Sequence, residues 1–352
     1  RRVEPTGFFH ARNVDGRWWL VDPEGCLFVH VGVVNVTPGR SRNMQTAFQA
    51  RFGTPEAWAD YTTRMLKAHH FNGTGAWSDV ELIRKAPTKL AYTCIWNFLA
   101  EFGKSKGIAH MEPGHYGYAG GCMPVFLPDF EAFCDRHARQ LLAYKDDPWL
   151  VGHFSDNELP GRKDSLDRFL ALDPNDPNLA PSYHAAAEWL AARKGRTAGL
   201  DDVTDEDRDA FLGYVFERYF RVTTEAIKCY DPNHLALGPR LHSYEKYVSS
   251  VFQAAGRYLD VIAVNYYRVW GPQKQDLDNW IAWSGKPVMI TEWYAKGADA
   301  GLPNHSGAGW TVPTQRDRGL FYQHYVLGLL ESRKCVGWHW FKYLDDPAES
   351  KA

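Results

Sequence analysis

Eight short segments rich in apolar and β-branched residues recur along the chain, and longer amphipathic stretches separate them. This alternation is typical of β-α units that build a parallel sheet. The predicted strands are 27–35, 71–77, 90–96, 150–155, 235–241, 261–266, 288–291 and 335–341. The predicted helices between them are 55–69, 79–85, 130–144, 211–229, 243–255, 276–283 and 314–332.

Eight strands with seven intervening helices favour a (β/α)8 TIM barrel over an open doubly wound sheet. The open sheet would also need a glycine-rich phosphate loop after its first strand, and residues 35–39 (Asn-Val-Thr-Pro-Gly) do not form one. Only residues 345–352 follow the last predicted strand, too few for a closing eighth helix. We therefore expect either a truncated chain or a natural chain that continues.

Two segments lie outside this repeating pattern. In residues 8–26 an aromatic strand lies between two turn signals, which predicts a β-hairpin on the bottom of the barrel. We therefore divide the chain into an N-terminal hairpin segment, 1–26, and a catalytic barrel, 27–352. Residues 159–209 form a long insertion between the fourth strand and fourth helix, with a helix at 183–194, and suggest a lid or cleft wall.

Composition limits the partners of this chain. Its 352 residues carry a net charge of -2 without a long Lys/Arg run, which argues against nucleic acid or an anionic membrane. No stretch of about 18 apolar residues occurs, and the first residues do not form a signal peptide. The six cysteines lack metal-site spacing, so we predict no metal or cofactor, and buried thiols with one disulfide as an open alternative. The oligomeric state is left open.

Two glutamates carry the clearest chemical signal. Barrel enzymes place reactive groups at the carboxyl ends of their strands. Glu158 follows the fourth predicted strand and Glu292 ends the seventh, so the two face each other across the barrel mouth. Retaining glycoside hydrolysis needs one protonated and one anionic carboxyl about 5 to 5.5 Å apart. The sequence therefore predicts a retaining glycosidase rather than a metallohydrolase or serine hydrolase, because HExxH and GxSxG motifs are absent.

Other strand ends supply candidate sugar-binding residues, for each of which packing or a structural hydrogen bond is the alternative. We expect Asn157 to bind a 2-hydroxyl group and Tyr267 to hold a nucleophilic carboxylate. Because 14 tryptophans suit a carbohydrate cleft, we expect some of them to stack on sugar rings. The remaining candidates are Asn35, Trp77, Arg240, His242, Asn265, Trp310, Trp338 and Trp340.

Several longer motifs resemble the β-agarases of glycoside hydrolase family 50, and the likeness covers almost the whole chain. They are residues 15–25 (DGRWWLVDPEG), 156–159 (DNEL), 291–304 (TEWYAKGADAGLPN), 306–310 (SGAGW) and 336–343 (VGWHWFKY). The resemblance implies a clan A barrel that cleaves β-1,4-galactosidic bonds of agarose with retention, often from a chain end to give neoagarobiose. It assigns Glu158 as acid/base, Glu292 as nucleophile and residues 298–310 to the cleft.

Two departures from the family pattern accompany this likeness. The carbohydrate-binding-like N-terminal domain of many relatives is not in this sequence. No arginine ends the second strand, where many clan A enzymes have one. The substrate class implies a secreted or periplasmic protein. The alternatives are a galactosidase or galactanase for another algal galactan, such as porphyran, and a barrel that binds sugar without cleaving it.

Overall fold

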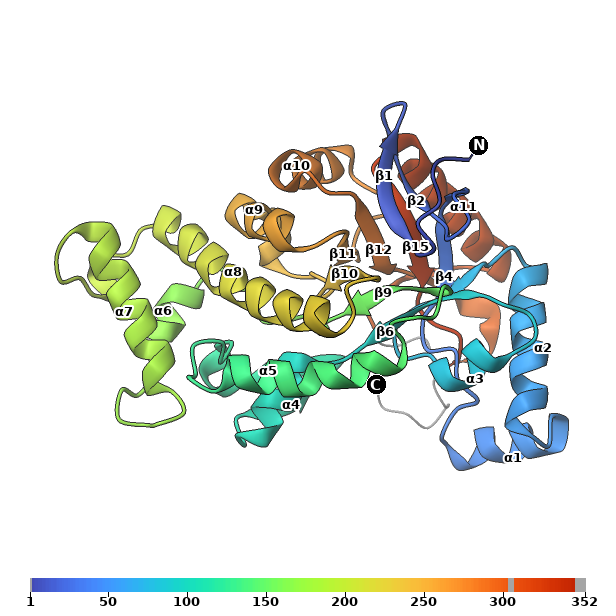
Figure 1. Ribbon diagram of the computed structural model, residues 1–352, viewed down its shortest axis with the longest axis horizontal. Coiled ribbons are helices and arrows are strands. Elements are labelled where there is room, and N and C mark those ends of the chain that lie inside the picture. The colour runs from blue at the N-terminus through green and yellow to red at the C-terminus, as the bar shows by residue number, and fades with distance from the viewer. Residues whose placement is uncertain (1, 303–306, 346–352) are drawn as a thin grey trace.

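The computed structural model describes residues 2–302 and 307–345, and its centre is a parallel barrel of eight strands (Figure 1). Around the barrel the strands follow the order β10, β9, β6, β5, β4, β15, β12 and β11, and a bridge from Leu241 to Val264 joins β10 to β11. The strands are β4 (His30–Val33), β5 (Gly73–Thr74), β6 (Ala91–Ile95), β9 (Leu150–Phe154), β10 (Leu235–Gly238), β11 (Ile262–Asn265), β12 (Val288–Glu292) and β15 (Cys335–Trp340). The predicted (β/α)8 class is confirmed.

Seven main helices surround the barrel, one after each strand except β15. They are α2 (Pro55–Ala68), α3 (Val80–Lys85), α5 (Phe130–Ala138), α8 (Asp205–Tyr230), α9 (Ser249–Tyr258), α10 (Lys274–Ser284) and α11 (Gln315–Ser332). Residues 341–345 after β15 contain no helix, and the end that we predicted to be too short for one, 346–352, lies outside the described residues.

Side-chain caps explain where three of these helices begin. Thr54 accepts a hydrogen bond from the backbone of Ala57 at the start of α2, as Thr-Pro at positions 54–55 predicted. Thr204 and Asp207 form a reciprocal capping box, so α8 begins well before the predicted position 211. An equivalent box begins α11.

The structure adds elements that the sequence pattern did not predict. After β4 comes α1 (Arg42–Arg51), and after β6 come α4 (Phe98–Ser105) and the hairpin of β7 (Ala109–Glu112) and β8 (His115–Tyr118). The long insertion holds α6 (Ser165–Leu170) and α7 (Ala180–Lys194), which lie beyond one end of α8 (Figure 1). Short elements complete the chain: β13 (Ala295–Gly297), β14 (Trp310–Val312), and 3-10 turns at 119–121, 139–143, 200–202, 244–247 and 298–300.

A three-stranded antiparallel sheet lies at the amino-terminal end of the barrel. It consists of β1 (His10–Val14), β2 (Arg17–Val21) and β3 (Leu27–Phe28), so the continuous strand predicted at 27–35 is divided between this sheet and β4. Phe9 and Leu20 pack with Val151 and Met289 of the barrel strands in one buried cluster. The sheet therefore closes the floor of the barrel with apolar side chains.

Two buried histidines fill the barrel interior. His339 Nε2 lies 2.9 Å from His30 Nδ1, and burial lowers the pKa of His30 to about 4, so the pair is neutral. A Cβ atom at position 73 would lie 1.9 Å from His30 Nε2, which explains the glycine there. The His30 side chain inside the barrel therefore requires glycine on the neighbouring strand β5.

The described residues contain no disulfide, because all six cysteines are free thiols, and the open alternative of one disulfide is wrong. No helix among them combines the length and apolar character that a membrane crossing requires.

The barrel floor yields a stability prediction. Leu20→Ala removes a side chain that is 0% exposed and leaves a cavity, so we expect the free energy of unfolding to fall by about 2–5 kcal/mol. The matched control Leu142→Ala, at a position 49% exposed, should change it by less than about 0.5 kcal/mol. Chemical denaturation monitored by tryptophan fluorescence measures both, and equal effects would contradict the role of Leu20 as a floor residue.

Candidate active site

Glu158 is positioned by the turn that follows β9. Asp156, two residues earlier, is buried and accepts hydrogen bonds from the backbone of Leu99 and Ala100 and from the hydroxyl of Tyr219. Glu158 itself has a left-handed backbone, with φ of 51°, and donates its N–H to the carbonyl of Pro239 at 3.0 Å. The turn is thus held by the segments that follow the two neighbouring strands, β6 and β10.

Glu292 is the last residue of β12 and is 5% exposed. The hydroxyl of Tyr267 donates to its Oε2 atom at 2.6 Å. Arg240 Nη2 lies 2.8 Å from its Oε1 atom and also donates to the carbonyl of Thr291, while Oε1 is buried and accepts no aligned hydrogen bond from the described residues. One oxygen is therefore held by a hydrogen bond, and the other is paired by charge alone.

Amide side chains connect the two glutamates. Asn265 donates to Glu158 Oε1 at 2.8 Å and accepts from Thr291 at 2.8 Å. Asn157 accepts from Arg240 at 3.0 Å and from Asn265 at 3.3 Å. Both glutamates thus belong to one hydrogen-bonded network that spans β9, β10, β11 and β12.

Burial and nearby charges together raise the pKa of Glu292. Burial raises the pKa of Glu292, the positive charge of Arg240 opposes this shift, the negative charge of Glu158 adds to it, and the Tyr267 hydrogen bond opposes it. The nearby charges of Glu292 and Glu158 also keep the Tyr267 hydroxyl protonated, after burial has raised its pKa. The site therefore holds a carboxylate in a buried position where negative charge is costly without Arg240 and Tyr267.

An open cleft of about 1220 Å³ lies above the two glutamates. Four of the predicted binding residues line it: Asn35, Trp77, His242 and Tyr267. Three others, Asn157, Arg240 and Asn265, lie in the network behind it, so their contact with a ligand stays a prediction. None of the described residues 159–209 lines the cleft, because α6 packs on the outer helices α7 and α8; the expectation of a lid or cleft wall there is wrong.

Arg240 supplies the positive charge that an arginine at the end of the second strand would provide. Trp77, which follows the second barrel strand β5, has its ring 4.6 Å from the Arg240 guanidinium. Arg240, which is 0% exposed, reaches Glu292 from the end of the fifth barrel strand instead. The positive charge beside Glu292 is therefore present but comes from another part of the barrel.

The expectation of a stacking platform at Trp338 and Trp340 is wrong. Side chains on a strand alternate between faces, and here His339 points into the barrel while its two neighbours point outward. Trp338 donates to the hydroxyl of Tyr322 on α11, and Trp340 packs against Trp293. Both are core residues between β15 and α11.

The aromatic residue Trp310 lies beside the cleft rather than in it. It is 42% exposed, and its indole donates to the carbonyl of Val269. Gly307 and Ala308 of the same segment line the cleft, as expected for 298–310, whereas the motif residues Pro303, Asn304 and Ser306 lie outside the described residues.

The hairpin of β7 and β8 is the main part of the site that the sequence did not predict. Its turn residues Pro113 and Gly114 line the cleft, and the Gly114 carbonyl accepts from Asn157. His115 Nδ1 lies 3.9 Å from Glu158 Oε2. The Pro-Gly pair at 113–114 between short polar runs was the available signal for a turn.

Left-handed backbone conformations gather at the barrel mouth. Of the nine described non-glycine residues with positive φ, six lie within four residues after the end of a barrel strand. They are Asn35, Trp77, Asn97, Glu158, Arg240 and Arg268. Such conformations cost energy for residues with a Cβ atom and persist only where the surroundings hold them.

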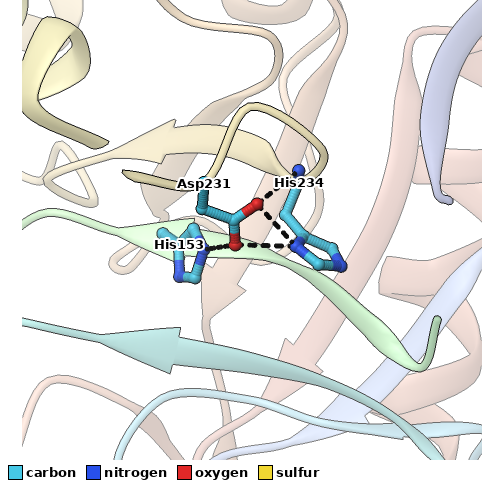
Figure 2. Close-up of side chains that lie close together, drawn as sticks. All are labelled: His153, Asp231 and His234. Carbon is cyan, nitrogen blue, oxygen red and sulfur yellow. Dashed lines mark hydrogen bonds and ion pairs between the residues drawn. The ribbon is translucent and has the colours of Figure 1, made fainter. Parts of the chain in front are cut away.

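A group with metal-ligand chemistry lies elsewhere, where His153, Asp231 and His234 meet in the core (Figure 2). His153 Nδ1 accepts from the Trp96 indole at 2.9 Å, so its Nε2 carries the hydrogen that is donated to Asp231 at 2.7 Å. The two nitrogens of His234 face oxygen acceptors, Asp231 at 2.7 Å and the carbonyl of Asp147 at 2.9 Å. Since every ring nitrogen already has a partner, we interpret the cluster as a structural junction of β9, β10 and the end of α8.

Comparisons with known proteins were made for the whole chain, and no protein-family model matches it. Beta-agarase B of Vibrio sp. (strain JT0107) is 23% identical over 452 aligned residues, which cover 100% of this chain and 45% of that protein. The chain therefore spans less than half the length of this curated relative.

Solved structures give the stronger match. The crystal structure of BpGH50 is 35% identical, covers 98% of this chain and 77% of that chain, and has a TM-score of 0.85. The agarase AgWH50C, at 21% identity and a TM-score of 0.78, covers 99% of this chain and 58% of its own and shows the same fold.

We predict that the carboxylate of Asp231 stabilises the folded protein. Asp231→Asn keeps only one oxygen acceptor between two buried histidine N–H groups, and a buried donor left without a partner costs about 1–3 kcal/mol. We expect a fall in melting temperature, whereas the exposed control Asp201→Asn should leave it unchanged. Calorimetry with and without a chelator checks this assignment: a melting temperature of the unmodified protein that fell with chelator would reveal a metal instead.

Proposed function

Because the chain belongs to glycoside hydrolase family 50, we propose that it is a retaining β-agarase that cleaves β-1,4-galactosidic bonds of agarose-type galactans. The observation that carries this proposal is the pair Glu158 and Glu292 at the ends of the fourth and seventh barrel strands, connected by Asn265, Asn157 and Arg240. Two carboxyl groups on one cleft are the minimum chemistry for retaining hydrolysis, with an expected separation of about 5 to 5.5 Å.

In the first step, Glu292 attacks the anomeric carbon while Glu158 donates its proton to the departing glycosidic oxygen. The bond to the leaving sugar breaks, and an ester between Glu292 and the remaining sugar forms. In the second step, Glu158 takes a proton from water, the water oxygen attacks the anomeric carbon, and the Glu292 ester bond breaks. Both glutamates return to their starting states.

The contacts of Glu292 support its assignment as nucleophile. A nucleophile must be anionic, and Arg240 and Tyr267 both favour the carboxylate over the acid. Glu158 lies in the cleft wall and accepts a hydrogen bond from the neutral amide of Asn265, which leaves its second oxygen without a hydrogen bond from the described residues. We further propose release of neoagarobiose from a chain end and a secreted or periplasmic location, because a polysaccharide cannot enter a cell intact.

Paired substitutions test the two roles. Glu158→Gln should reduce hydrolysis of neoagaro-oligosaccharides by roughly 10²–10⁴-fold, because general acid catalysis is lost. A nitrophenyl β-galactoside needs no protonation of its leaving group, so this variant should partly recover formation of the glycosyl-enzyme, whereas Glu292→Gln should not. The control Glu188→Gln, exposed on α7, should retain full activity. Burst kinetics of nitrophenolate release distinguish the two glutamates, and identical behaviour of both variants contradicts the assignment.

The hydroxyl of Tyr267 should set the acidic limb of the pH-rate profile. Tyr267→Phe removes a hydrogen bond to charged Glu292, worth about 1.5 kcal/mol or more, so the pKa of Glu292 should rise. Activity requires the carboxylate, so the acidic limb of kcat/KM should move to higher pH. Tyr244→Phe is the matched control, since Tyr244 also lines the cleft but donates to Asp209. An acidic limb that stays in place in Tyr267→Phe excludes this role.

A further inference from the structure

The cleft carries more positive charge than cleavage of a neutral polysaccharide requires. Apart from the two proposed catalytic glutamates, its charged lining among the described residues is one acid, Asp345, and a larger set of bases. The bases are Lys246, Arg268, Lys296, Arg318 and Lys342. Two of them, Lys246 and Arg268, differ from the others in their surroundings.

Lys246 is a buried cation without an anionic partner. It is 6% exposed and lines the cleft, and its Nζ atom makes no hydrogen bond or ion pair with any described residue. The rings of Tyr266 and Tyr247 lie 5.6 and 5.8 Å from that atom. An unpaired buried charge is costly, and Lys is almost never buried this deeply without a partner.

Each of two acidic groups near Lys246 accepts a hydrogen bond from another donor, although Glu245 Oε2 is buried without a partner among the described residues. Glu245 accepts from the backbone N–H groups of His242 and Ser243 at 2.7 and 2.9 Å. Asp276 accepts a hydrogen bond from the hydroxyl of Tyr266. Burial lowers the pKa of Lys246, the charges of Glu245, Glu158 and Asp276 oppose that shift, and the charge of Arg268 adds to it. The ammonium group is therefore near three acidic residues but forms an ion pair with none of them.

Arg268 places a second positive charge in the cleft that Lys246 lines. It follows β11 with a left-handed backbone, φ 63°, and its guanidinium makes no hydrogen bond or ion pair within the described part of the chain. Its charge acts on Lys246, and both side chains line the same cleft as Glu158. Arg268 is exposed and Lys246 lines the same cleft, so an anion bound there could compensate both positive charges.

We propose that Lys246 and Arg268 form a subsite for an anionic substituent, a sulfate ester or a carboxylate, on a galactan bound in the cleft that Glu158 and Glu292 line. This inference rests on the proposed function, because it takes a galactan as the substrate. The preferred polymer is then a substituted, acidic galactan rather than neutral agarose.

The test compares defined oligosaccharides that differ only in the substituent. The ratio of kcat/KM for a 6-sulfated galactan tetrasaccharide to that for its desulfated counterpart should exceed about ten, since a charge-assisted contact contributes about 1.5 kcal/mol or more. Lys246→Met and Arg268→Gln should each bring this ratio down several-fold. The control Lys67→Met, an exposed lysine on α2, should leave the ratio unchanged.

A second arm uses a galactan tetrasaccharide with a carboxylate substituent in place of the sulfate. A preference for it that depends on Lys246 identifies a carboxylate as the natural anion, and a preference for the sulfated compound identifies a sulfate ester. Ratios near one for both compounds overturn the inference, and so does a preference that Lys246→Met does not change. Calorimetric binding of the same compounds to Glu292→Gln reports the preference without turnover, so a failed inference is distinguished from a failed hydrolase proposal.

Discussion

The architecture depends on closure of the parallel sheet between β10 and β11. These strands meet through the bridge of Leu241 and Val264, and the backbone N–H of Asn265 donates to the Leu241 carbonyl. Closure brings strand ends that are more than a hundred residues apart in sequence to one rim. Without it, Glu158 and Glu292 would lie near opposite edges of an open sheet, and Asn265, which pairs with Glu292, would not reach Glu158.

The network at the rim couples the position of each glutamate to that of the other. Arg240 is shared between Asn157 and Glu292, and Asn265 is shared between Glu158 and Thr291. Each of these side chains is fixed by two partners on different strands. A displacement of one strand end would therefore change the contacts of both carboxylates, which explains why so many buried polar groups gather at this level of the barrel.

Much of the fold followed from residue patterns, because each barrel strand is an apolar run between turn signals. The two glutamates were predictable for the same reason: each ends such a run. Trp338 and Trp340 show the limit of this reasoning, since alternation alone states that they share a face but not which face is inside. Lys246 and the hairpin of β7 and β8 were not predicted, because their places depend on contacts between distant segments rather than on any local pattern.

The left-handed residues at the strand ends have a consequence for the evolution of this protein. Glycine would relax the backbone at Trp77, Glu158 or Arg240, yet it would delete a side chain that the rim needs. Selection at these positions therefore retains the strained residue and must recover the lost stability elsewhere in the chain, in the apolar floor and the helix caps. Substitutions that rigidify those remote regions should widen the range of rim sequences that the barrel tolerates, and so the range of polysaccharides that descendants of this protein can come to recognise.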